Sequence, residues 1–285
     1  MPIPEAELTK DDGLIAPEVG LWATTKHRKI AYYSSLFATS MKKKWDFRVY
    51  IDLFAGSGKA RIRDTQKIIP GSPLRALNTI DPFNKYIFCE KSSENMDALK
   101  QRVKSLFEDK DCSFILGDAN ICTEDILKAI PPFTKKFRGL SFCLADPYKM
   151  GDLHFDTIRK IAAYIYVDFL ILIPSYMDIN RNPRIYLKAS NQYIDNYLGT
   201  ATWRHHWMDI NSKKKGFGAF IAEEFCKQIK SLGYLYESFS DLELVRMETG
   251  KNLPLYHLAF FSRNELGLKF WRTTKKSTSD QRTLW

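Results

Sequence analysis

Four carboxylate side chains stand at or just beyond the ends of apolar runs that have the composition of buried strands. They are Asp52, Glu90, Asp118 and Asp146. In a parallel α/β sheet the carboxyl ends of the strands meet at one edge, and ligands bind in the crevice outside that edge. Carboxylates placed there can accept hydrogen bonds from a ribose hydroxyl, an adenine amino group or a target amine. The pattern therefore predicts a binding site for a nucleotide-like ligand.

The first of these acids is followed by a glycine-rich turn, Leu53-Phe54-Ala55-Gly56-Ser57-Gly58. Glycine permits a sharp turn and a close approach of the backbone to a ligand. An acid inside a buried strand, as Asp52 is, costs free energy unless a neighbour hydrogen-bonds it. The alternative is a glycine-rich turn in some other α/β protein. The dinucleotide pattern G-x-G-x-x-G is absent, which disfavours a nucleotide-dependent oxidoreductase.

The last of the acids begins the tripeptide Asp146-Pro147-Tyr148. Pro147 stiffens the backbone and keeps the preceding residue extended, while Tyr148 offers a flat face to a base. The tripeptide resembles the [Asn/Asp]-Pro-Pro-[Tyr/Phe] motif of amino-methyltransferases, in which the polar side chain holds the target amine and the aromatic ring stacks on a flipped base. The alternative is a strand-end acid beside a packed tyrosine.

The elements that must position these residues alternate between strand-like and helix-like patterns. Predicted strands are Val49–Leu53, Lys85–Glu90, Cys112–Leu116, Leu140–Ala145 and Asp168–Ile173; predicted helices are Leu21–Lys44, Leu74–Ile80, Ser93–Phe107, Phe155–Ala163 and Phe217–Leu232. Two further strand-like runs, about Asp241–Met247 and Leu255–Ser262, form a hairpin. Five βα units, a helix and a terminal hairpin predict an α/β, Rossmann-like fold with a seven-stranded sheet, as in class I S-adenosylmethionine-dependent methyltransferases.

The segments that connect these elements contain residues typical of loops and of helix ends. Residues 1–20 are rich in proline and glycine and indicate a loose arm, and Lys59–Ile69 is basic and irregular. Ser72 is a candidate N-cap, with Pro73 at the first helical position. Lys42-Lys43-Lys44 suits the carboxyl end of a helix dipole.

The composition favours a globular, basic protein. The chain has 285 residues, 45% of them apolar, and its 43 Lys and Arg against 33 Asp and Glu give a net charge of +10. An excess of positive charge is compatible with a nucleic-acid partner. No apolar run approaches the roughly 20 residues of a membrane span, and the first residues lack the order of a signal peptide. We therefore expect a cytoplasmic protein without a membrane partner.

The five cysteines form no C-x-x-C pair, so buried reduced thiols are expected and no metal site is predicted. In residues 177–215 aromatic and basic side chains interleave, which suits stacking on bases and contact with phosphates. An equally plain alternative is a helical insert that packs its aromatic rings on the sheet.

Taken in order along the chain, several motifs together resemble the three-Cys-motif partner (TcmP) proteins. The matching stretches are Lys26-His27, Tyr50 to Gly58, Gly71 to Leu77, Tyr86 to Glu90, Gly117-Asp118-Ala119-Asn120, Asp146-Pro147-Tyr148 and Leu255-Tyr256-His257-Leu258. This resemblance implies pairing with a protein that carries the cysteine motif. The family name does not itself imply a reaction.

The same order of motifs also resembles, more distantly, the large-subunit rRNA adenine amino-methyltransferases related to RlmJ. That likeness implies S-adenosylmethionine as cofactor and Asp146 as the group that engages the target amine. The implied cofactor-binding residues are Lys26, His27, Asp52, Phe54, Ala55, Gly56, Gly58, Glu90, Asp118 and Ala119, and the implied catalytic residues are Asp146, Pro147 and Tyr148. On residue type alone, His27 would be structural, because a lone histidine on a helix usually is.

One departure from the rRNA enzymes is the single proline of Asp146-Pro147-Tyr148-Lys149, which shifts the aromatic ring by one position. Two functions follow as hypotheses: a methyltransferase acting on an amino group of a nucleic-acid base, or a non-catalytic, methyltransferase-like partner of a cysteine-motif protein. The expected parts are an arm and cofactor-covering helix (1–48), a methyltransferase-like domain (49–268) with a helical insert at about 177–215, and a basic, mobile tail (269–285).

Overall fold

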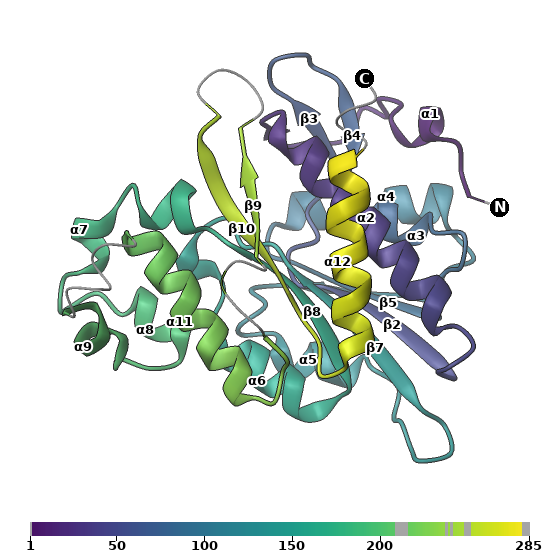
Figure 1. Ribbon diagram of the computed structural model, residues 1–285. Coiled ribbons are helices and arrows are strands. Elements are labelled where there is room, and N and C mark those ends of the chain that lie inside the picture. The colour runs from purple at the N-terminus through teal and green to yellow at the C-terminus, as the bar shows by residue number, and fades with distance from the viewer. Residues whose placement is uncertain (1, 209–215, 237–238, 240–241, 248–251, 281–285) are drawn as a thin grey trace.

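A seven-stranded sheet forms the centre of the molecule in the computed structural model (Figure 1). The structure describes residues 2–280 apart from 209–215, 237–238, 240–241 and 248–251, and only the backbone of 274–280. The strands are β2 (Phe47–Asp52), β5 (Lys85–Glu90), β6 (Cys112–Leu116), β7 (Gly139–Ala145), β8 (Val167–Ile173), β9 (Glu243–Arg246) and β10 (Pro254–Phe261). The predicted strands and the terminal hairpin are confirmed; most of the hairpin turn lies outside the described residues.

The order of the strands is β6-β5-β2-β7-β8-β10-β9, and β10 runs antiparallel to both of its neighbours. The other pairs in the sheet are parallel. From β2 the chain adds β5 and β6 on one side and then returns to add β7 on the other. Because the direction of winding reverses between β2 and β7, the connections there leave a crevice at the carboxyl edge.

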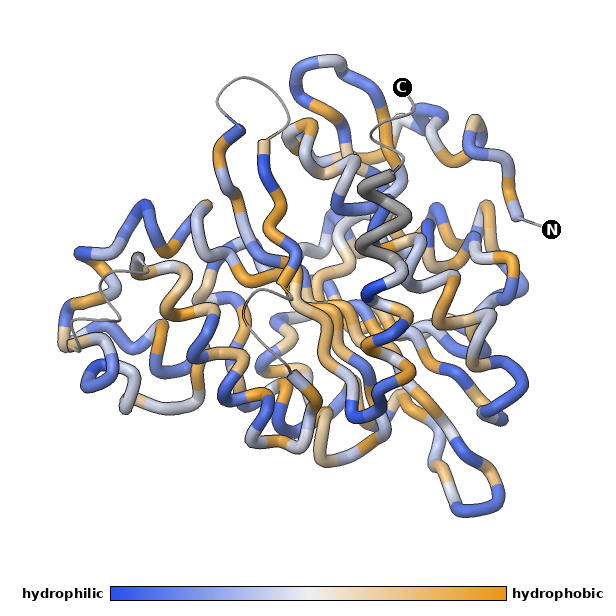
Figure 2. The backbone as a smooth tube through the Cα atoms, viewed as in Figure 1, coloured by the Kyte–Doolittle hydropathy of each residue, from blue (hydrophilic) through white to orange (hydrophobic). Residues whose placement is uncertain are grey.

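Alternate residues of each strand face two separate hydrophobic layers, as a period of two requires. Tyr50 faces the layer that contains α2 (Trp22–Met41), α3 (Ser72–Leu77), α4 (Ser93–Leu106) and α12 (Glu265–Asp280). Val49 and Ile51 face the layer that contains α5 (Thr123–Lys128), α6 (Phe155–Tyr164) and α11 (Phe217–Ser231). Figure 2 shows the apolar residues concentrated in the central strands. Both faces of the sheet are thus covered, which explains its continuous apolar strands.

Two segments expected to lack regular structure contain short elements. The arm forms α1 (Glu5–Leu8) and β1 (Glu18–Val19), and β1 pairs with β3 (Lys59–Ile62), which pairs with β4 (Ile68–Pro70). The expectations of a loose arm and of an irregular Lys59–Ile69 were therefore wrong. These strands are too short for a clear periodic pattern, and β1 pairs with a strand about 40 residues further along the chain.

The expectation of a mobile tail from residue 269 was also wrong as far as residue 280, because α12 continues through Asp280. The indole of Trp271 is buried, and its ring centre lies 5.9 Å from that of Tyr33 and 5.8 Å from that of Phe260. Trp271 is thus the buried anchor of this helix, and the partly buried Leu266, Leu268 and Phe270 pack against the same hydrophobic layer.

The insert consists of a π-helical turn η2 (Ser175–Ile179), α7 (Pro183–Tyr186), α8 (Tyr193–Leu198) and α9 (Trp203–Met208). Tyr186, Tyr197 and Trp203 are buried in the core. These three side chains therefore pack in the core, as the alternative of a packed helical insert predicts, and cannot stack on a nucleic acid. Residues 209–215, which were included in the predicted insert, lie outside the described residues.

Removing the indole of Trp271 should destabilise the protein. For Trp271→Ala we expect the free energy of unfolding to fall by roughly 3–5 kcal/mol, because a large buried side chain is deleted. Urea unfolding followed by circular dichroism measures the change. Lys269→Ala, on the exposed side of the same helix, is the control and should stay within about 0.5 kcal/mol of wild type. Equal effects of the two changes would mean that α12 does not depend on this contact.

Candidate functional site

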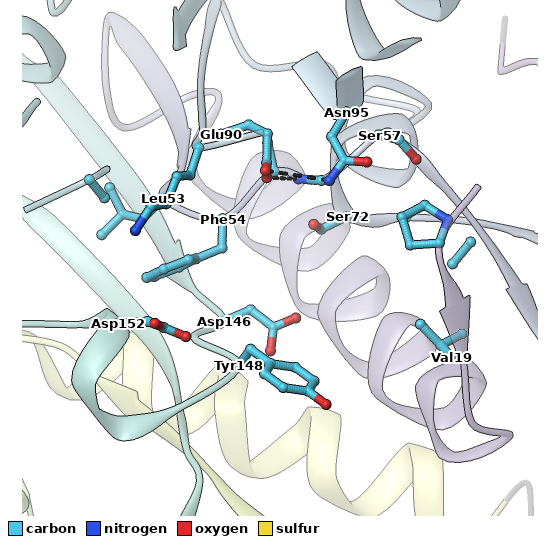
Figure 3. A pocket seen from close by; sticks show the side chains of 18 of the residues that line it. Val19, Leu53, Phe54, Ser57, Ser72, Glu90, Asn95, Asp146, Tyr148 and Asp152 are labelled. Carbon is cyan, nitrogen blue, oxygen red and sulfur yellow. Dashed lines mark hydrogen bonds between the residues drawn. The ribbon is translucent and has the colours of Figure 1, made fainter. Parts of the chain in front are cut away.

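A cavity of about 410 Å³ lies at the carboxyl edge of the sheet. Its walls come from the loops after β2, β5, β6 and β7, from α2 and from the N-terminal arm (Figure 3). This is the crevice that the reversal between β2 and β7 predicts. The site is therefore built from segments that are far apart in sequence and that only the sheet brings together.

The glycine loop after β2 forms one wall in conformations that favour glycine. Gly56 has φ +63° and Gly58 has φ +84°, both in the left-handed region that most residues avoid. A Cβ at Gly58 would lie 2.9 Å from Leu99 Cδ1 on α4, and Gly71 N donates a 2.7 Å hydrogen bond to Gly58 O. No heavy atom lies within 4 Å of a Cβ placed on Gly56. Gly58 thus packs closely while Gly56 leaves open space.

Glu90 lines the cavity and also holds its loops. Its Oε2 accepts a 2.8 Å hydrogen bond from Gly56 N, and its Oε1 accepts one of 2.8 Å from Ser92 N and a longer one from Asn95 Nδ2. Figure 3 shows this carboxylate beside Asn95. Three donors leave part of the acceptor capacity of the carboxylate unused. Glu90 therefore fixes the loop geometry and can still accept a further hydrogen bond.

Asp118, on the loop after β6, lies in the cavity wall beside Ala119. Its Oδ1 accepts hydrogen bonds from the backbone and side chain of Asn120, and its Oδ2 lies 3.1 Å from Lys91 Nζ. Partial burial raises the pKa of Asp118, but these partners outweigh burial and hold the pKa below its ordinary value. The group is therefore a carboxylate at neutral pH.

Asp52 does not line the cavity, although the sequence pattern placed it among the cofactor-binding residues. It is fully buried beneath the glycine loop, where it accepts hydrogen bonds from Phe54 N (3.2 Å), Tyr50 OH (3.3 Å) and the Ser72 hydroxyl. Burial raises the pKa of Asp52 to about 7, and the hydrogen bonds offset this only in part. Its side chain supports the loop from below.

Asp146 projects into the cavity from the end of β7, and its Oδ2 lies 2.5 Å from Lys26 Nζ on α2. This ion pair is partly exposed. Tyr148 lies next to it in Figure 3 and is 77% exposed at the rim. Pro147 is buried and does not line the cavity. The acid and the aromatic ring are thus on the cavity side, and the proline shapes the turn between them.

His27 lines the cavity but faces the backbone of the β4–α3 turn. Its Nδ1 lies 3.1 Å from Pro70 O; because a carbonyl only accepts, Nδ1 must carry the hydrogen. Burial lowers the pKa of His27 to about 3, helped by the charges of Lys26 and Arg75. The ring is therefore neutral at physiological pH and cannot act as a cation there.

A buried carboxylate on the insert anchors the loop that carries Asp146 and Tyr148. Asp178 Oδ2 accepts hydrogen bonds from Met150 N (2.9 Å) and Tyr186 OH (2.6 Å). Asp178 belongs to η2, and Met150 begins the short 3₁₀ turn η1 (Met150–Asp152) directly after the loop. The insert thereby fixes one end of this loop. The sequence did not predict this contact between the insert and the loop.

The N-terminal arm supplies another wall, through Pro17 and Val19. The guanidinium of the buried Arg102 binds both carboxylate oxygens of Asp12 and donates a 2.6 Å hydrogen bond to Ser57 O in the glycine loop. Lys59 Nζ adds an ion pair to Asp12 at 2.9 Å. One arginine on α4 therefore joins the arm to the glycine loop.

The cavity brings most of the predicted residues together. Those in its lining are Lys26, His27, Phe54, Ala55, Gly56, Gly58, Glu90, Asp118, Ala119, Asp146 and Tyr148, whereas Asp52 and Pro147 lie behind it. The residues that the sequence reasoning missed include Pro17, Val19, Lys59, Ser72, Lys91, Asn95 and Asp152. Among these residues only Ser72 was singled out in the sequence, as a candidate N-cap. That prediction was wrong, because Gly71 is the N-cap and the Ser72 hydroxyl donates a hydrogen bond to Asp52.

Within the part of the chain that the structure describes, no group of three or more His, Cys, Asp or Glu side chains is placed to hold a metal ion. Cys89, Cys143 and Cys226 are buried, while Cys112 and Cys122 are partly exposed. The helices of the described residues include none that is long and apolar enough to span a membrane.

The strand order and the antiparallel β10 give this chain the fold of class I S-adenosylmethionine-dependent methyltransferases. No protein-family model matches the sequence, and no curated protein matches it. The resemblances to the TcmP proteins and to the RlmJ-related enzymes therefore stay predictions.

Among solved structures, three to which this chain is similar at low sequence identity are the following. A Legionella pneumophila protein assigned to the DUF519 family is 13% identical, with a TM-score of 0.49, over 87% of this chain and 91% of that one. Trm1 from Pyrococcus horikoshii, in complex with S-adenosyl-L-methionine, is 9% identical, with a TM-score of 0.43, over 94% of this chain and 63% of Trm1. The magnesium protoporphyrin IX methyltransferase of Synechocystis, with bound SAH, is 8% identical, with a TM-score of 0.40, over 84% of each chain.

The stability of the protein should depend on pH through Asp52. Its pKa rises from 3.8 in the unfolded chain to about 7 in the folded chain. The folded chain therefore holds a proton that the unfolded chain releases, and the free energy of unfolding falls as pH rises from about 4 to about 7. In Asp52→Asn this contribution is absent, so stability should fall less between about pH 5 and about pH 7.5 than in wild type.

Urea unfolding at the two pH values measures this difference. Burial also raises the pKa of Asp168 to about 7, so Asp52→Asn should remove only part of the slope. Asp97→Asn, at an exposed position on α4, should leave it unchanged. A full wild-type slope in Asp52→Asn would show that Asp52 is already ionised at low pH.

Proposed function

We propose that this protein is an S-adenosylmethionine-dependent methyltransferase that acts on an amino group of a nucleic-acid base. The observation that carries the proposal is the placement of Asp146: its carboxylate enters the same cavity as the glycine loop, at the carboxyl edge of the strand next to β2. A group placed there lies between a cofactor in the crevice and an acceptor arriving from solvent. The exposed ring of Tyr148 lies at the entrance.

The volume of the cavity and the hydrogen-bonding groups in its walls suit S-adenosylmethionine. A volume of about 410 Å³ is within the range of small-molecule sites, and the open space at Gly56 allows a ligand to approach the backbone. Glu90 would accept from the ribose hydroxyls, Asp118 from the adenine amino group, and the Phe54–Gly58 loop would enclose the methionine part. When bound, the cofactor supplies an electrophilic methyl group on a sulfonium.

The chemical role of Asp146 is to orient an amine. Its Oδ2 pairs with Lys26, and no hydrogen bond to its Oδ1 occurs within the described part of the chain. Oδ1 would accept a hydrogen bond from the target N–H and point the nitrogen lone pair into the cavity. The Lys26 ammonium fixes the carboxylate in this orientation. The contribution to rate is mainly positioning of the nucleophile.

A nucleic-acid base is the acceptor class that agrees best with the surroundings of the site. Tyr148 presents a largely exposed aromatic face beside Asp146, and base–aromatic stacking stabilises bound bases by about 1–3 kcal/mol each. The net charge of +10 attracts a polyanion. Although the single proline shifts the ring relative to the rRNA enzymes, Tyr148 still lines the cavity.

Cofactor binding is the first expected outcome. Calorimetric titration with S-adenosylmethionine and S-adenosylhomocysteine should show micromolar binding to the wild-type protein. Asp118→Ala should weaken binding at least tenfold, because the carboxylate proposed for the adenine amino group is lost. Asp125→Ala, an exposed acid on α5 outside the cavity, should bind within about twofold of wild type. A folded wild-type protein that binds neither compound would refute the cofactor assignment.

Loss of the amine-binding carboxylate should separate catalysis from cofactor binding. For Asp146→Ala we expect methyl transfer to a pool of unmodified RNA or DNA to fall at least a hundredfold, while cofactor affinity stays within a few fold. Transfer of a radiolabelled methyl group measures the first quantity and calorimetry the second. Equal losses of both would assign Asp146 to cofactor binding instead.

The same experiments discriminate the rival function, a non-catalytic partner of a cysteine-motif protein. The ion pair with Lys26 is the observation that favours it, because a carboxylate held by an ammonium at 2.5 Å already has a partner. Cofactor binding without transfer to any nucleic-acid pool, together with co-purification of such a partner, would support the rival.

A further inference from the structure

Two basic segments meet at the amino edge of the sheet, opposite the cavity. One is the segment from the residue after α2 to the start of β2, residues 42–47, and the other is the loop into β7, residues 133–138. Asp46 N and Phe47 N donate to Arg138 O at 3.1 and 3.2 Å, and Arg138 Nη2 donates to Lys44 O at 2.9 Å. Figure 1 shows the loop into β7 projecting beyond the lower edge of the sheet. The two segments therefore form one surface.

The charges of this surface are largely unneutralised. Lys43, Lys44, Lys135 and Lys136 are exposed, and none of them forms an ion pair with another described residue. The acid between them, Asp46, accepts a hydrogen bond from Arg138 N. Arg138 Nε also lies 4.0 Å from Asp46 Oδ2. Four ammonium groups that have no ion-pair partner among the described residues therefore remain, and they make an anion-attracting surface.

Exposed aromatic rings lie among these charges. Phe137 is 41% exposed and Tyr166 is 62% exposed. The ring of Tyr166 lies 5.9 Å from that of Trp45, and the guanidinium of Arg138 lies 5.5 Å from the Trp45 ring centre. The ring of Phe137 packs with one side against Phe47 and Phe133, at centroid distances of 5.8 and 6.0 Å, and leaves the remainder to solvent. Flat rings set among free cations are the arrangement by which proteins bind single-stranded nucleic acid.

We infer that this surface, made of residues 43–45, 135–138 and Tyr166, binds single-stranded nucleic acid. The lysines contact phosphates, and the rings of Tyr166 and Phe137 stack on bases. β2 runs from this surface to the cavity, a distance of about 17 Å at the usual rise per residue. The surface is therefore separate from the proposed methyl-transfer site. The exposed aromatic rings favour a nucleic acid over an acidic protein, because bases stack on such rings and carboxylates do not.

The test is fluorescence anisotropy with a labelled oligouridine of about 12 nucleotides and the full chain, without cofactor. The double variant Lys135→Glu and Lys136→Glu should weaken binding at least tenfold and lower the slope of log affinity against log salt by about 1.4. The matched control is Lys100→Glu with Lys104→Glu, two exposed lysines on α4 that give the same change in net charge; it should stay within about threefold of wild type. Tyr166→Ala should weaken binding about fivefold to a hundredfold.

Equal weakening by the two double variants would overturn the inference, because only net charge would then matter. So would no binding by the wild-type protein, or displacement of the oligonucleotide by polyglutamate at equal charge concentration. Since the assay contains no cofactor, failure of methyl transfer leaves its result unaffected. A protein that binds the oligonucleotide through this surface but transfers no methyl group would refute the proposed activity alone.

Discussion

The parallel pairing of β2 with β5 on one side and β7 on the other is the constraint on which the site depends. Asp52 at the end of β2 stands opposite Phe88 and Leu144, and β5 and β7 end two residues and one residue later, so the three loops leave the same edge of the sheet close together. This register brings the glycine loop, Glu90 and Asp146 to one cavity. A shift of one residue would turn every side chain of β2 to the opposite layer.

Buried ionisable groups then hold the loops in place. Asp52 supports the glycine loop from below, Arg102 joins that loop to the N-terminal arm, and Asp178 anchors the segment after Asp146. Burying such groups costs free energy, which their hydrogen bonds offset only in part, as the raised pKa of Asp52 shows. The gain is a set of loops with fixed geometry, which binding and positioning of a nucleophile require.

The two ends of the sheet differ in chemistry. The carboxyl edge carries the cavity with its acids, whereas the amino edge carries exposed rings around Trp45 and lysines for which the described part of the chain supplies no ion-pair partner. A basic net charge alone does not show where a polyanion would bind, because most of the lysines and arginines lie apart in sequence. Hydrogen bonds between residues 44–47 and Arg138 create the basic surface by joining two segments about 90 residues apart.

The strands of the seven-stranded sheet, the long helices and the acids at the strand ends could be predicted from the sequence, because apolar periodicity and glycine turns are local properties. The predicted acids Glu90, Asp118 and Asp146 line one cavity, and their roles there stay predictions. Three features appear only in the tertiary structure: Asp52 lies behind the cavity, Pro17 and Val19 form a wall that Arg102 ties to the glycine loop through Asp12, and Trp271 of the C-terminal helix is buried. These features rest on contacts between residues distant in sequence, for which composition and spacing carry no signal.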